Sequence, residues 1–321
     1  MDFSNFIKGF QNKKATGTVP RKGLRVWWVL RLLVFTVVIF LIGLYALFSV
    51  LFAQFLLKSP TPWTAEETPA AYGLKYSEVS FPAAEDSLAV KGWFVPATTP
   101  SDKVIIVLHG KGQNRGSYLP FGAVLAKNGY NVLLFDFRGH GETAGQNYTF
   151  GYYEQRDVAG AVTYLKKQGY QAGHMGMLGY SLGAVAGLLA FSQDDVKAMV
   201  SDSAFADLGP RLDLALSGYL EPPLEPLLLP GIETAATFLT GLDINKVRPV
   251  EAVRHLGNRH ILLIHGDKDQ TAPYTDSVEM KKAAGDNADL WIVPGATHAL
   301  AYEKDPQEYT SRLLAFFGRE L

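Results

Sequence analysis

The hydrophobic pattern of the chain begins with one long apolar segment near the N-terminus. No charged residue occurs between Leu32 and Leu57, a stretch of 26 residues. As a helix this stretch would be about 39 Å long, which exceeds the roughly 30 Å hydrocarbon core of a bilayer. A buried helix of a globular domain is rarely apolar on every face, and the apolar part of a cleaved signal peptide is shorter. The pattern therefore predicts one transmembrane helix, at residues 26–57.

The charges on the two sides of this helix differ. Residues 1–25 are basic: together with Arg31 they contribute seven Lys and Arg side chains against the single acid Asp2. On the other side, Lys58 is soon followed by two glutamates. Basic residues favour the cytoplasmic side of a membrane. We therefore expect a single-pass membrane protein with a cytoplasmic N-terminus and an extracytoplasmic domain.

Beyond the helix, residues 58–71 are rich in Pro, Thr and Ala, a composition typical of a linker. From residue 72 onward, apolar runs of strand length alternate with segments of helical period. This alternation is typical of a mainly parallel sheet covered by helices on both faces, so we expect residues 72–321 to form one α/β domain. The predicted parallel strands begin at Lys103, Asn131, His174, Val196, His260 and Asp289.

Two segments depart from this alternation. Leu88–Pro96 alternates apolar and polar residues, which predicts an antiparallel strand at the start of the sheet. Residues 207–249 contain no strand pattern, only Leu-rich stretches interrupted by Pro. We expect this second segment to be a helical insertion that covers one end of the sheet as a cap.

Composition and spacing exclude several function classes. A formal net charge of −1 provides no basic excess for a phosphate backbone, so no nucleic-acid partner is expected. The absence of cysteine rules out disulfides, thiolate metal sites and cysteine nucleophiles. No cluster of His, Asp and Glu has the spacing of metal ligands, and no GxGxxG motif opens a helix after the first strand. We therefore expect neither a catalytic metal nor a dinucleotide cofactor.

The pentapeptide Gly179-Tyr180-Ser181-Leu182-Gly183 fits the G-x-S-x-G pattern of a nucleophile elbow. A predicted strand precedes Ser181 and an apolar helical segment follows it, which is the context this turn requires. Glycines on both sides would let the turn form without a Cβ clash. The pattern predicts Ser181 as a nucleophile and the backbone amide of Leu182, at the helix N-terminus, as an oxyanion donor.

A serine hydroxyl needs a general base, and the base needs an acid to hold its tautomer. His298 lies in the loop after the last predicted strand, and Asp267 and Asp269 lie in the loop after the strand before it. Asp202 also ends a strand. Sites in open α/β sheets form at these carboxyl ends, so we expect His298 as the base and one of the three aspartates as the acid.

Five motifs resemble those of the α/β-hydrolase family, in the expected order: LHGKGQNRG, FDFRGHGETAG, LGYSLGA, HGDKDQTAP and GATHAL. Within that family the chain is similar to monoacylglycerol lipases and serine aminopeptidase-like enzymes, some of them membrane-anchored. The resemblance covers roughly Tyr76 to the C-terminus and implies the α/β-hydrolase fold. It also implies that Asp269, the last residue of an HGxxD pattern, is the acid and that Asp267 forms a turn. In some relatives the acid stands where Asp202 does.

The resemblance also assigns roles to the two earlier motifs. The second oxyanion amide would belong to Lys111, a position where the family often has a small or amide residue. His109 beside it would brace this loop rather than react. Asp136, Arg138 and His140 are expected to hold loops at the strand ends in the same way.

Together these residues predict a membrane-anchored serine hydrolase that cleaves an acyl ester through an acyl-enzyme, without a cofactor. Ester, thioester and amide cleavage share this triad, so thioesterase and peptidase activities stay open. The apolar insertion and the nearby membrane favour a small acyl substrate with a lipid-like tail, although a cap that only packs on the core would be apolar too. The alternative without catalysis is a silent, membrane-tethered interaction protein that retains the fold.

The predicted orientation can be tested on cells with an intact plasma membrane. A protease added outside should remove a C-terminal epitope, because residues 72–321 are expected on the outer side, and should spare an N-terminal epitope. Immunoblotting of both epitopes provides the measurement. Survival of the C-terminal epitope until detergent opens the membrane would contradict the orientation.

Overall fold

The computed structural model describes residues 21–59, 63–193, 196–217 and 224–321. It divides into two compact units, residues 1–49 and 50–321. Parts of three predicted segments lie outside the described residues: 1–20 of the basic N-terminus, 60–62 of the linker and 218–223 of the insertion.

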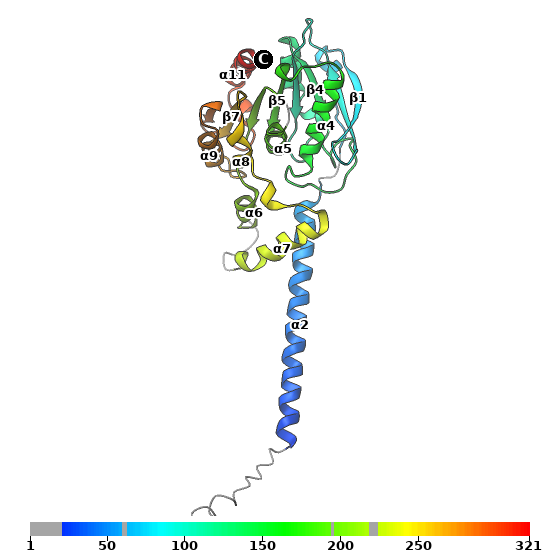
Figure 1. Cartoon of the computed structure of the whole chain (residues 1–321), viewed down its shortest axis with the longest axis vertical. Coiled ribbons are helices and arrows are strands. Elements are labelled where there is room, and N and C mark those ends of the chain that lie inside the picture. The colour runs from blue at the N-terminus through cyan, green and yellow to red at the C-terminus, as the bar shows by residue number, and fades with distance from the viewer. Residues whose placement is uncertain (1–20, 60–62, 194–195, 218–223) are drawn as a thin grey trace, which may run out of the picture. The chain divides into compact units, whose positions relative to one another are not determined.

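The described part of the first unit is helical. Helix α2 (Arg21–Leu57), blue in Figure 1, begins in this unit and ends in the second. Its residues Val26–Leu57 are long and apolar enough to cross a membrane, which agrees with the helix predicted at the same residues.

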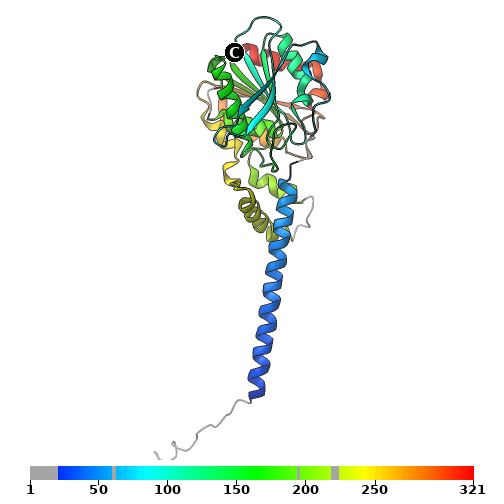
Figure 2. The same ribbon diagram turned by 90° about the vertical axis from the view of Figure 1, so that its right-hand side faces the viewer.

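The second unit is built on one eight-stranded sheet with the order β1-β2-β4-β3-β5-β6-β7-β8 (Figures 1 and 2). Strand β2 is antiparallel to β1 and β4, and all other neighbours are parallel. The mainly parallel sheet is confirmed, with β2 on the predicted antiparallel segment, whereas β1 was not predicted. The strands are β1 (Ser77–Pro82), β2 (Ala89–Val95), β3 (Val104–Leu108), β4 (Asn131–Phe135), β5 (Met175–Tyr180), β6 (Ala198–Asp202), β7 (His260–Gly266) and β8 (Ala288–Val293).

Helices cover both faces of the sheet (Figure 2). On one face α4, α5, α8 and α9 contact one another in that order. On the other, α3, α10 and α11 share an apolar core with the sheet. Strands β3 to β6 are buried at every residue, as expected of parallel strands between two helical layers. The helices are α3 (Leu119–Lys127), α4 (Glu154–Lys167), α5 (Leu182–Phe191), α8 (Pro249–Ala252), α9 (Thr275–Ala284), α10 (Ala301–Lys304) and α11 (Pro306–Glu320).

The insertion at residues 207–249 is mainly helical where the structure describes it, with α6 (Leu208–Ser217) and α7 (Glu225–Thr240) as its long elements. Its two ends are joined to each other. The Leu208 amide donates to the carbonyl of Val247 (3.0 Å), and Arg248 Nε donates to the carboxylate of Asp207 (2.7 Å). The first and last residues of the insertion are therefore neighbours in the fold.

The end of α2 and the predicted linker after it are hydrogen-bonded to the domain. The Tyr148 amide donates to the carbonyl of Leu57 (2.7 Å), so the last turn of α2 is joined to the loop before α4. The indole of Trp63 donates to the carbonyl of Gly112 (2.9 Å), in the loop after β3. A composition typical of linkers did not reveal these bonds, because their acceptors and donors lie in distant parts of the sequence.

Candidate active site

Ser181 stands on a sharp turn between β5 and α5. Its backbone angles, φ 50° and ψ −111°, lie in a region that residues with a side chain rarely adopt. A Cβ on Gly183 would lie 2.3 Å from the carbonyl oxygen of Leu108, and a Cβ on Gly179 would lie 2.6 Å from that of Gly183. Only glycine fits at either position, so the two glycines allow the turn to pack against β3 and expose Ser181.

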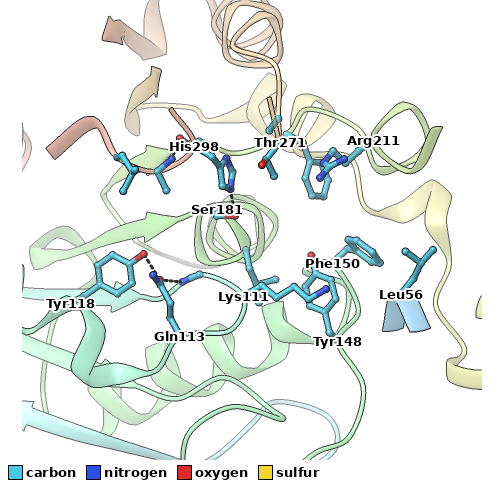
Figure 3. Close-up of a pocket in the computed structure, with 17 residues that line it drawn as sticks. Leu56, Lys111, Gln113, Tyr118, Tyr148, Phe150, Ser181, Arg211, Thr271 and His298 are labelled. Carbon is cyan, nitrogen blue, oxygen red and sulfur yellow. Dashed lines mark hydrogen bonds between the residues drawn. The ribbon is translucent and has the colours of Figure 1, made fainter. Parts of the chain in front are cut away.

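Three of the predicted residues form one hydrogen-bonded chain. His298 Nε2 lies 2.8 Å from Ser181 Oγ (Figure 3), and His298 Nδ1 lies 2.6 Å from Asp269 Oδ2. Ser181 follows β5, Asp269 follows β7 and His298 follows β8, all at carboxyl ends of parallel strands. With Nδ1–H donated to the carboxylate, Nε2 is left to accept the serine hydroxyl proton, which is the tautomer that general-base catalysis requires.

The structure separates the three candidate acids. Only Asp269, of the three, is hydrogen-bonded to His298 among the described residues. The carboxylate of Asp202 accepts the hydroxyls of Ser203 and Tyr309, and burial raises its pKa to about 6. The carboxylate of Asp267 accepts the amide of Gly295 (2.6 Å).

Asp269 is held ionised by its neighbours. Burial alone would raise its pKa, but hydrogen bonds from His265 and His298 outweigh that effect and hold the pKa well below its usual range. The amides of Thr271 and Ala272 also donate to the carboxylate, at 2.8 and 2.9 Å. A carboxylate with so many donors is both fixed in orientation and suited to stabilise an imidazolium.

His265, which the sequence analysis did not single out, is one of these donors. It is fully buried at the end of β7, and its Nε2 lies 3.1 Å from Asp269 Oδ2 and 2.9 Å from the carbonyl oxygen of Ala272. Both contacts are acceptors, so Nε2 carries a proton, and Nδ1 accepts the hydroxyl of Ser277. The signal for this residue was its place four positions before Asp269 in the same motif.

Both predicted oxyanion donors line the cavity that contains Ser181. Leu182 is the first residue of α5, so its amide has no carbonyl within the helix to donate to. The loop after β3 approaches the serine closely, because a Cβ on Gly110 would lie 3.7 Å from Ser181 Cβ. Lys111 follows in this loop. The oxyanion role of the two amides stays a prediction.

His109 and the motif after β4 lie in bracing positions. His109 Nδ1 donates to the carbonyl of Gly110, its Nε2 accepts the amide of Phe137, and burial lowers its pKa to about 3. Neutral and doubly bonded, His109 ties the loops after β3 and β4 together. Among the motif residues, Asp136 accepts two amides, Arg138 is bonded to Asp157, and His140 to a carbonyl.

The cavity around Ser181 has a volume of about 440 Å³ (Figure 3). Its wall includes three side chains that the sequence analysis missed: Leu56 from the last turn of α2, Tyr148 from the loop before α4 and Arg211 from α6. Lys111 Nζ lies 4.2 Å from the centre of the Tyr148 ring. These residues are distant in sequence and match no motif, so only the folded chain brings them together.

Comparison with known proteins gives three kinds of match. The family model described as serine aminopeptidase S33 matches residues 99–241. YqkD of Bacillus subtilis is 29% identical over 258 residues, covering 79% of this chain and 78% of that protein, and YfhR of Escherichia coli K12 is 24% identical over 268 residues, covering 80% and 82%. The solved structure of the Pyrococcus furiosus esterase Pf2001 superposes with a TM-score of 0.67 at 25% identity, covering 82% of this chain and 99% of that one.

The strained backbone at Ser181 predicts an order of stability for two inactive variants. Ser181→Gly removes a strain of roughly 1 to 3 kcal/mol, offset by about 0.5 to 1 kcal/mol of extra chain entropy, whereas Ser181→Ala keeps the Cβ that causes the strain. We expect the glycine variant to be more stable by about 1 kcal/mol. Thermal unfolding of both full-length variants in the same detergent measures the difference. An alanine variant more stable than the glycine variant by about 0.5 to 1 kcal/mol, the entropy cost of glycine alone, would show that the turn stores no strain.

Proposed function

We propose that this chain, which has the α/β-hydrolase fold, is a membrane-anchored serine hydrolase that cleaves an acyl ester. The observation that carries the proposal is the hydrogen-bonded chain from Ser181 through His298 to Asp269. A hydroxyl, a base that accepts its proton and an acid that holds the base are the parts that acyl transfer to serine needs.

In the first half of the reaction, Ser181 Oγ attacks the carbonyl carbon of the ester while His298 Nε2 takes the hydroxyl proton. The Asp269 carboxylate stabilises the imidazolium that forms, and the amides of Leu182 and Lys111 donate to the oxyanion. The bond to the alcohol oxygen then breaks, and His298 returns its proton to that oxygen. The acyl group is left on Ser181.

In the second half, a water molecule takes the place of the alcohol. His298 removes a proton from the water as its oxygen attacks the acyl carbon, and the same two amides again stabilise the oxyanion. Collapse of the tetrahedral intermediate releases the carboxylic acid, and the proton on His298 returns to Ser181 Oγ. The enzyme is then ready for a second substrate.

An ester fits the cavity better than the free N-terminus of a peptide. The matching family model is named for serine aminopeptidases, whose substrates carry an ammonium group. A site for that group needs a carboxylate, and no Asp or Glu occurs in the part of the cavity wall that the structure describes. That wall instead contains the cations Lys111 and Arg211. The similar structure of Pf2001, described as an esterase, supports the same choice.

Anchoring belongs to the same proposal. The apolar residues Val26–Leu57 of α2 would lie in the membrane, with the N-terminus in the cytoplasm and residues 58–321 on the other side. The helix would hold the domain at the membrane surface, where esters with an apolar tail are found.

Three isosteric variants test the triad in the full-length protein. Asp269→Asn should lower kcat for p-nitrophenyl butyrate by roughly 10³- to 10⁴-fold, because the amide stabilises the wrong imidazole tautomer. Asp267→Asn makes the same change two residues away and serves as the matched control, with activity close to that of the unaltered protein. Asp202→Asn tests the remaining candidate acid. Its kcat should stay close to that of the unaltered protein, because the change leaves Ser181, His298 and Asp269 in place.

The outcomes separate the alternatives. Full activity of Asp269→Asn together with loss in Asp202→Asn would move the acid to Asp202. A matched alanine p-nitroanilide should be cleaved far more slowly than the ester, and the reverse order would indicate a peptidase. A folded protein that cleaves neither substrate would be the silent interaction protein instead.

A further inference from the structure

Two cationic side chains line the cavity around Ser181 from separate parts of the chain. Lys111 comes from the loop after β3 and Arg211 from helix α6 of the insertion. Among the described residues, no carboxylate forms an ion pair with either one, whereas Arg138 and Arg248 are paired with acids. The aromatic ring of Tyr148 under Lys111 Nζ attracts a cation but does not neutralise its charge.

The acids near this pair attract it without forming an ion pair with it. Partial burial and the positive charge of Arg211 lower the pKa of Lys111, although Glu154 opposes this effect. Burial lowers the pKa of Arg211, although the charges of Asp269 and Asp276 oppose this effect. Asp269 is hydrogen-bonded to His298, and Asp276 accepts the amide of Ala206. The carboxylate of Glu154 already accepts the Thr149 hydroxyl and two backbone amides. Two cations that repel each other beside a cavity gain free energy when an anion enters it.

The rest of the wall is largely apolar, and the last turn of α2 contributes to it. Leu56, Phe150, Phe205 and Leu300 line the cavity. In Figure 3, Lys111 and Arg211 lie on the same side of Ser181 as Leu56 and Phe150. A residue from the last turn of the apolar helix therefore forms part of the same cavity as both cations.

A backbone hydrogen bond joins the end of α2 to this part of the wall. The carbonyl of Leu57 accepts the amide of Tyr148, the residue whose ring contacts Lys111. If α2 is the membrane anchor, as proposed above, its last turn lies at the membrane surface, and the cavity opens where amphiphiles are concentrated. An anion-binding pair and an apolar wall at such a surface fit a ligand with both characters.

From these observations we infer that the cavity binds an amphiphile with an anionic head group, and that Lys111 and Arg211 contact its phosphate or carboxylate. Resting on the proposed function, this assigns the substrate class: the acyl ester of an anionic membrane lipid. The hydrocarbon part lies against the apolar wall and the ester carbonyl at Ser181. The resemblance predicts a small or amide residue where this chain has Lys111. The inference gives the Lys111 side chain a role in binding the anionic group, in addition to the proposed oxyanion role of its backbone amide.

Binding of simple probes tests the inference without turnover. Octyl phosphate and octylphosphocholine share a chain and a phosphate group, but only octyl phosphate has a net negative charge. Titration calorimetry on the full-length protein in an uncharged detergent should show octyl phosphate binding at least about tenfold more tightly, because Lys111 and Arg211 would repel the choline cation of octylphosphocholine. Inorganic phosphate should bind more weakly than octyl phosphate, because it has no chain.

Variants identify the residues responsible. Arg211→Gln and Lys111→Gln should each lower the preference for octyl phosphate several-fold. Arg254→Gln removes the same charge from an exposed residue that does not line the cavity and should retain the full preference. Equal affinities for the two octyl probes, a preference that survives both cavity variants, or inorganic phosphate binding as tightly as octyl phosphate would overturn the inference.

Turnover extends the test to the substrate. An oleoyl ester of glycerol phosphate should have a kcat/KM about tenfold above that of monooleoylglycerol in mixed micelles, and Arg211→Gln should bring the ratio close to one. Cleavage of both esters at equal rates would overturn this inference and leave the proposed function intact. Cleavage of p-nitrophenyl butyrate but of neither oleoyl ester would likewise overturn this inference and leave the proposed function intact. Failure to cleave any of the three esters would overturn the proposed function, while the calorimetry still decides whether the cavity binds an anionic amphiphile.

Discussion

The close contact between Gly183 and the carbonyl oxygen of Leu108 is the constraint on which the site depends. Because Gly183 has no side chain, the first turn of α5 packs directly against the end of β3, where a Cβ would clash with the Leu108 carbonyl. That approach places Ser181 between two loops, with the loop of Lys111 on one side and His298 on the other. A larger residue at this position would separate the nucleophile from the loop expected to stabilise its oxyanion.

Electrostatics around Asp269 complement this steric constraint. Two histidines and two backbone amides converge on one buried carboxylate, so its charge is stabilised although water is largely excluded. His298 donates to this carboxylate from the loop after β8, and His265 donates to the same oxygen from the end of β7. The backbone turn thus positions Ser181, the proposed nucleophile, and the carboxylate positions His298, the proposed base.

Much of the fold could be predicted from the sequence because its signals are local. The buried parallel strands are continuous apolar runs, α4 and α5 lie on segments of helical period, and the turn at Ser181 has a recognisable glycine pattern. Strand β1 escaped prediction because most of its residues are at least partly exposed and its last residue is a proline. The choice of Asp269 over Asp202 rested on resemblance alone, since both follow buried strands; the hydrogen bond to His298 distinguishes them.

The features that sequence reasoning missed all depend on contacts between distant segments. Leu56 lies in an apolar helix whose composition indicates a membrane span, and nothing in that composition points to the cavity. Arg211 lies in an insertion without motifs, and Trp63 in a segment with the composition of a linker. The significance of each of these residues becomes clear only when the structure shows what its side chain contacts. The residues of the proposed triad could therefore be predicted from the sequence, whereas the cavity wall that suggests a ligand is defined only by the folded chain.

The identity of the nucleophile is tested most directly by covalent labelling. A fluorophosphonate reacts with a serine only when a neighbouring base and oxyanion donors activate it. After treatment of the folded full-length protein in detergent, peptide mass spectrometry should find one adduct, on Ser181, and no adduct in protein unfolded before treatment. An adduct on another residue, or a folded protein that stays unlabelled, would contradict the account.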